Sequence, residues 1–244
     1  MPIYETGHAR NLEHFQQMIT YVESWGDTYI PTNTAILPTA LNAKKTAVAT
    51  AIAGVTTTNA AFKAATNDRE NTFSGLRKLV TRVVNFYKST GPEQNQIDSV
   101  ASLQRKINGK RAEVVQEDDP STPENEADNS VSASQQSYTQ LVEHFQGLIE
   151  ILDADAAYNP SETDLKVTAL NTLKTAMTTA NTAVMNAAVP LSTSRGTRDA
   201  AMYADGTGLV DLAQLVKNYV KAAYGTASMQ YDQIKGLKFT RYKA

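Results

Sequence analysis

The chain of 244 residues contains no cysteine. This absence excludes a disulfide framework, a thiolate metal site and a cysteine nucleophile. The sequence also lacks a run of 18 or more apolar residues, which a membrane-spanning helix would need. Residues 1–8 have neither a basic start nor an apolar stretch, so we expect no secretory signal and a cytoplasmic location.

The chain has no large excess of charge of either sign. Lys and Arg total 23 against 25 Asp and Glu, which gives a formal net charge of −2. This balance supplies no global field for nucleic acid or an anionic membrane. With 41% hydrophobic and 20% charged residues, the composition is that of a soluble chain able to bury a core. We therefore expect protein partners, no nucleic acid and no membrane, whereas the oligomeric state stays open.

Motifs of known catalytic and cofactor sites are missing as well. The sequence has no Gly-x-Ser-x-Gly, His-Glu-x-x-His or EF-hand pattern. Residues 205–208 (Asp-Gly-Thr-Gly) lack the third glycine and the lysine of nucleotide-binding loops, so they predict a turn between helices. A di-metal helix bundle needs Glu-x-x-His on two helices, and this spacing occurs only at Glu5 and His8. We assign no catalytic, cofactor-binding or metal-binding residue, and we expect no cofactor.

An internal repeat covers most of the sequence. Residues 12–16 and 142–146 match at a shift of 130, and further matches follow in the same order along the chain. Such ordered matches are hard to produce from shared composition, so they indicate a duplication. The shift grows from 129 to 133 near residues 205–208, which predicts an additional turn there. The matched positions include Tyr29 and Tyr158, Pro31 and Pro160, residues 39–42 and 168–171, Arg69 and Arg198, and residues 75–76 and 208–209.

A segment of different composition separates the two copies. Residues 113–136 contain Pro120, Pro123 and clustered acidic residues, and no Lys or Arg occurs from residue 112 to 165. A segment with so few apolar residues cannot offset the entropy lost on ordering. We predict a flexible acidic linker between residues 1–112 and residues 137–244, with a docking site for a basic partner as the alternative.

Apolar residues in both copies recur at helical spacing. Steps of three and four predict a first helix in each copy, and Pro31 and Pro160 mark where these helices end. The next helices carry apolar residues seven apart, which is heptad packing. Ser137 and Gln140 have the form of a capping box, and Asp164 is expected to accept from the first amides of a helix. The stripes are Leu12, Phe15, Ile19 and Val22 with Val142, Phe145, Ile149 and Leu152, then Leu41, Val48, Val55 and Phe62 with Leu170, Met177 and Val184.

Further stripes predict a third and a fourth helix in each copy. Four amphipathic helices with short connections favour antiparallel neighbours around a common core. The sequence therefore predicts an all-α protein of two tandem up-down-up-down four-helix bundles, residues 1–112 and 137–244. A domain-swapped or merged arrangement of the same helices would use the same stripes.

Three further features are candidates for specific chemistry, and each also has a purely structural explanation. His14 and His144 occupy equivalent positions beside apolar stripes, and we interpret them as packing histidines rather than ligands. Residues 46–62 and 175–194 are rich in Ala and Thr, which predicts enclosed helices with hydroxyls bonded to their own backbone, or alternatively segments that insert into lipid. Basic residues gather late in each copy, where they complement helix C-termini. They are Arg105, Lys106, Lys110, Arg111, Lys235, Lys238, Arg241 and Lys243.

These observations favour a non-enzymatic structural or protein-interaction module. A membrane-active, pore-forming-like helical protein that uses the Ala/Thr-rich second helices is the alternative. A metal-dependent helix-bundle enzyme is the third hypothesis.

Overall fold

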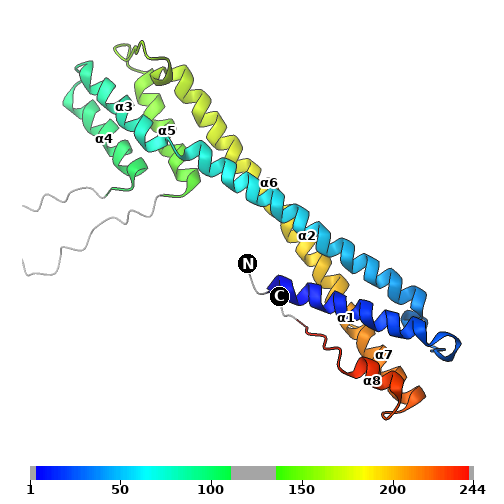
Figure 1. The fold of residues 1–244 in the computed structure, drawn as a ribbon. Helices are drawn as coiled ribbons and strands as arrows, with labels where there is room; N and C mark the ends of the chain where they lie inside the picture. The colour runs from blue at the N-terminus through cyan, green and yellow to red at the C-terminus, as the bar shows by residue number, and fades with distance from the viewer. Residues whose placement is uncertain (1–3, 111–135, 242–244) are drawn as a thin grey trace, which may run out of the picture. The chain divides into compact units, whose positions relative to one another are not determined.

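The computed structural model describes residues 4–110 and 136–241, and every regular element in these ranges is a helix (Figure 1). The all-helical prediction is confirmed. The predicted linker, residues 113–136, lies outside the described residues except for Gln136. The α-helices are α1 (Tyr4–Ser24), α2 (Pro38–Phe73), α3 (Leu76–Ser89), α4 (Gln94–Asn108), α5 (Tyr138–Asp153), α6 (Val167–Tyr203), α7 (Leu209–Tyr224) and α8 (Met229–Lys235); the 3-10 turns are η1 (Gly26–Thr28), η2 (Thr34–Ile36) and η3 (Thr163–Leu165).

Local signals in the sequence place several helix ends. Pro38 is the first residue of α2, where a missing amide donor costs nothing. The Ser137 hydroxyl accepts from the backbone amide of Gln140 at the start of α5, as its spacing predicts. Asp164 lies in the first turn of η3, where its carboxylate accepts from its own backbone amide and also pairs with Arg82.

The described helices form two compact units whose boundaries lie within α2 and α6. Unit 1 contains Met1–Phe62 and Ala187–Ala244, and unit 2 contains Lys63–Asn186. The expected division into residues 1–112 and 137–244 differs from this clustering, because each unit combines helices from both halves of the sequence. The physical reason is helix length. With 36 and 37 residues, α2 and α6 each extend over about 54 Å, so their ends belong to different units.

The core of unit 1 lies where α1 packs against α7 and α8. The predicted stripe of α1 is buried here, with Phe15 and Ile19 fully enclosed and Leu12 only partly buried. Residues from the second half of the sequence complete this core. They include Met202, Leu209, Val216, Val220 and Ile234.

In the core of unit 2, the two halves of the sequence exchange the places that they have in unit 1. Phe145, Ile149 and Leu152 on α5 come from the second half of the sequence and are buried as predicted. Their surroundings come from α3 and α4, in the first half, together with parts of α2 and α6. The buried residues include Phe73, Leu76, Val80, Val83, Val100, Ile107, Leu170 and Met177.

Residues at matched positions make the same contacts in the two units. The Tyr29 hydroxyl donates to the Ile36 carbonyl at 2.9 Å, and the Tyr158 hydroxyl donates to the Leu165 carbonyl at 2.7 Å. Each tyrosine also meets an aromatic ring from the other half of the sequence. Tyr29 packs edge-on against Tyr219 with centroids 5.1 Å apart, and Tyr158 packs edge-on against Phe86 at 5.4 Å.

The Ala/Thr-rich helices are less enclosed than the sequence indicates. Val48, Val55, Met177 and Val184 are buried, but many residues between them are exposed. The prediction that these are the most enclosed helices was therefore wrong, because one apolar residue per heptad covers only a narrow seam. The predicted backbone bonding is present. The hydroxyls of Thr56, Thr57 and Thr58 donate to carbonyls four residues earlier.

Candidate functional site

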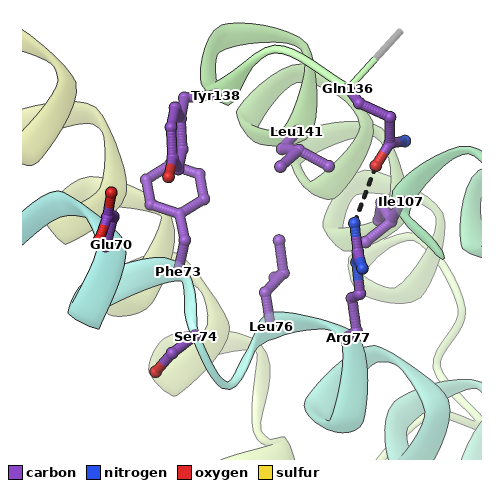
Figure 2. A pocket seen from close by; sticks show the side chains of 9 residues that line it. All are labelled: Glu70, Phe73, Ser74, Leu76, Arg77, Ile107, Gln136, Tyr138 and Leu141. Atoms are coloured by element: carbon purple, nitrogen blue, oxygen red, sulfur yellow. Dashed lines mark hydrogen bonds between the residues drawn. The ribbon is translucent and has the colours of Figure 1, made fainter. Parts of the chain in front are cut away.

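Unit 2 contains a pocket of about 370 Å³ where the end of α2, the start of α3, the end of α4 and the start of α5 meet (Figure 2). Its floor is apolar and its rim is polar. The lining residues are Glu70, Phe73, Ser74, Leu76, Arg77, Ile107, Gln136, Tyr138 and Leu141.

Buried side chains form the floor. Phe73, Leu76 and Ile107 are nearly or fully enclosed. The Phe73 ring meets the Tyr138 ring edge-on with centroids 4.8 Å apart. The Arg69 guanidinium lies over the Tyr138 ring, 4.0 Å from its centroid, in a cation–π contact. The floor is therefore a buried apolar surface bounded by aromatic rings.

The rim supplies hydrogen-bonding groups, among them the acidic Glu70 and the basic Arg77. Arg77 donates through Nη2 to Oε1 of Gln136 at 3.0 Å, and Gln136 donates through Nε2 to the Lys106 carbonyl. Figure 2 shows this pair on one side of the pocket, with Phe73 and Tyr138 on the other. Glu70, Ser74 and Arg77 are exposed to solvent. The rim can thus orient a polar or charged group beside an apolar one.

Gly109 permits the close approach of Gln136 to the end of α4. Its φ of 69° lies in the left-handed region, which glycine adopts without strain. A Cβ at this position would stand 3.1 Å from the carboxamide of Gln136. The rim geometry therefore depends on this glycine.

The matched positions in unit 1 carry different side chains. Tyr203 stands where unit 2 has Ser74, and the buried His8 stands where unit 2 has Tyr138. The His8 and Tyr203 rings lie 5.8 Å apart, and Nε2 of His8 lies 3.6 Å from a carboxylate oxygen of Asp199. At a shift of 129, the much larger Tyr203 is the counterpart of Ser74.

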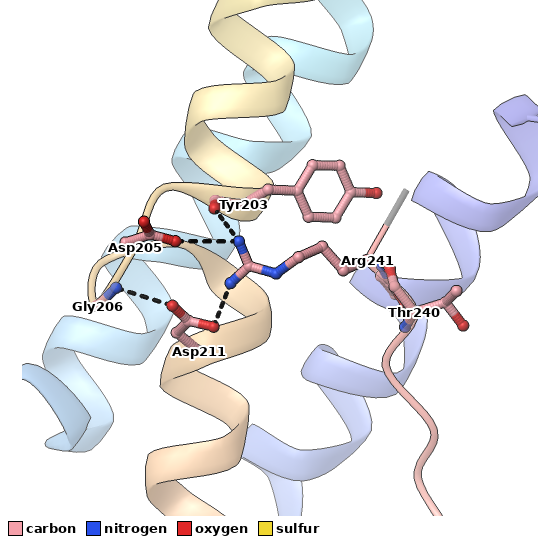
Figure 3. A network of polar contacts seen from close by, with 7 residues as sticks. Tyr203, Asp205, Gly206, Asp211, Thr240 and Arg241 are labelled. Carbon is pink, nitrogen blue, oxygen red and sulfur yellow. Dashed lines mark hydrogen bonds and ion pairs between the residues drawn. The ribbon is translucent and has the colours of Figure 1, made fainter. Parts of the chain in front are cut away.

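Unit 1 also has a polar network around Arg241 (Figure 3). The Arg241 guanidinium donates to the Tyr203 carbonyl at 2.7 Å and pairs with the carboxylates of Asp205 and Asp211. The backbone amide of Gly206 donates to Asp211 at 2.8 Å. The hydrogen bond from the Gly206 amide is the main cause that lowers the pKa of the Asp211 carboxyl below its ordinary value, and the hydrogen bond from Arg241 is the second. Residues 205–208 form the predicted turn, between α6 and α7.

The two matched histidines differ in their contacts. His14 donates through Nδ1 to the Lys238 carbonyl at 2.7 Å, and its ring meets Phe239 edge-on. His144 is half-buried, and burial followed by the nearby Lys106 lowers its pKa, which favours the neutral ring. Among the described residues there is no group of three His, Asp or Glu side chains placed to hold a metal ion.

Within the described ranges, no helix combines the length and the apolar character needed to cross a membrane. Comparison with known proteins finds no family model, no curated protein and no solved structure that matches the chain.

Sequence reasoning missed the pocket. The available signal was the difference between matched positions, Ser74 against Tyr203 and Tyr138 against His8. A small residue at a position where the other copy has a large one indicates open space only when its neighbours in the fold are known. Those neighbours come from the other half of the sequence.

Proposed function

We propose that the chain is a non-enzymatic protein-interaction module that arose by internal duplication and exchanges helices between its two copies. The ordered sequence matches support the duplication. The equivalent contacts of Tyr29 and Tyr158 support it further, because two unrelated halves have no reason to repeat both a buried hydrogen bond and an aromatic contact. The exchange is supported by cores that each draw on both halves.

In this proposal the pocket of unit 2 receives an apolar side chain of a partner protein. The observation that carries it is the combination of a buried apolar floor with an exposed polar rim. A volume of about 370 Å³ is near the lower limit of ligand pockets, and it suits one large side chain. The Arg77 guanidinium at the rim would pair with a carboxylate next to that side chain.

A peptide-display selection tests this function. The Ser74→Tyr variant places in unit 2 the residue that unit 1 has at the matched position, and it should fill the pocket. Ser89→Tyr is the matched control, because Ser74 and Ser89 are both exposed and each bonds to a carbonyl three residues earlier.

Peptides enriched on the unaltered chain should bear an apolar residue beside an acidic one. They should lose at least tenfold in affinity for Ser74→Tyr while keeping their affinity for Ser89→Tyr. Selection without enrichment, or peptides that bind both variants equally, would contradict a docking role for the pocket.

A further inference from the structure

Residues 237–241 of unit 1, which we call the 237–241 segment, follow α8 outside regular secondary structure. Leu237 is buried and Phe239 is half-buried, whereas Lys238 and Thr240 are exposed. This alternation is that of an extended strand with one face against a surface. The segment therefore lies on unit 1 as a bound extended peptide would.

Side chains of α1 and α7 hold the main chain of the segment. Asn11, only 2% exposed, donates to the Thr240 carbonyl at 2.8 Å and accepts from the Thr240 amide at 3.0 Å. His14 donates to the Lys238 carbonyl, and the Lys217 ammonium donates to the Leu237 carbonyl. Contacts to backbone groups do not depend on sequence, so they can hold other extended chains in the same way.

Two side chains of the segment add specificity. The Phe239 ring meets the rings of His14 and Phe15 edge-on at 6.1 and 6.5 Å, and the Lys217 ammonium lies 5.6 Å from its centroid. Arg241 is held by the Tyr203 carbonyl and by Asp205 and Asp211. Together with the buried Leu237, these contacts select the pattern apolar–x–aromatic–x–arginine.

The matched position in unit 2 differs at the central contact. Leu141 stands where unit 1 has Asn11, and a leucine side chain cannot exchange two hydrogen bonds with a peptide group. In unit 2, α4 continues as a helix as far as Asn108, whereas α8 ends at Lys235. Among the residues that the structure describes, main-chain capture of this kind is seen in unit 1.

We infer that this surface of unit 1, formed by Asn11, His14, Lys217, Asp205 and Asp211, binds an extended segment of a partner protein with the pattern apolar–x–aromatic–x–arginine. The 237–241 segment occupies the surface until the partner displaces it. The inference concerns a different unit from the pocket and rests on different contacts, so either can fail alone.

The test uses the full chain and a fluorescein-labelled peptide, Gly-Leu-Lys-Phe-Thr-Arg, which copies residues 236–241. Arg241→Glu sets a carboxylate against Asp205 and Asp211 and loosens the resident segment. This variant should bind the peptide at least tenfold more tightly than the unaltered chain. Adding Asn11→Leu should reverse the gain, and replacing phenylalanine by alanine in the peptide should weaken binding at least tenfold.

A second variant covers the case in which Arg241→Glu does not fold. Thr240→Pro removes the amide that donates to Asn11 and changes no core side chain. Equal binding of the peptide and a scrambled version, or no gain in either variant while α1 and α7 keep their amide protection, would overturn the inference. Concentration-dependent dimers of the unaltered chain, detected by light scattering, would also overturn it, because the occupant would then be a second copy.

Discussion

The buried tyrosine hydroxyls offer a sharp test of the packing in both units. In Tyr158→Phe, the Leu165 carbonyl loses its 2.7 Å hydrogen bond from a buried hydroxyl. A buried acceptor without its partner destabilises a protein by about 1–3 kcal/mol. Tyr29→Phe removes the equivalent bond, 2.9 Å long, and should cost a similar amount.

Urea denaturation measures this loss, with an unchanged m-value as evidence that only stability has changed. Tyr224→Phe is the control, because its hydroxyl donates to the Thr28 carbonyl at an exposed position where water can replace it. The control should change the free energy of unfolding by less than about 0.5 kcal/mol. If Tyr158→Phe costs no more than Tyr224→Phe, the buried hydrogen bond is absent and the reasoning is refuted.

Two further predictions concern alkaline pH and a glycine. Burial, with smaller contributions from Asp164 and Glu162, raises the pKa of Tyr158 from 10.0 to about 12. The pKa of Tyr158 is higher in the folded than in the unfolded chain, so its contribution to stability is fully present below pH 10 and is lost as the pH rises toward 12. Urea midpoints measured across this range should fall. In Tyr158→Phe they should fall less steeply with pH. Gly109→Ala forces a left-handed φ on alanine and should destabilise the protein by about 1 kcal/mol. The control Gly54→Ala, in the middle of α2, should not destabilise it. Equal losses of stability in urea denaturation would contradict the role of Gly109.

Helical periodicity predicted the buried faces well. Phe15, Ile19, Phe145 and Ile149 are enclosed as their spacing indicated, because a helical stripe must be covered by some partner. The same stripe does not say which partner covers it. Tyr29 could meet Phe86 of its own half or Tyr219 of the other, and both are aromatic.

The lengths of α2 and α6 decide that question, and the heptad pattern alone does not give them. The heptad pattern ended at Phe62, but α2 continues to Phe73 without a helix-breaking residue. The pocket depends on the same feature, since the end of α2 meets α5 from the other half there. A site assembled from two halves cannot be read from either half alone.

The exchange of helices between the halves is tested most directly by a double-mutant cycle on aromatic pairs. Phe86 and Tyr158 lie in different halves of the sequence, and their centroids are 5.4 Å apart. We predict a coupling energy of about 0.5–1.5 kcal/mol between Phe86→Leu and Tyr158→Leu. Tyr29→Leu and Phe86→Leu should add within about 0.5 kcal/mol. Coupling between Tyr29 and Phe86, with none between Phe86 and Tyr158, would contradict the exchange and favour two separate tandem bundles.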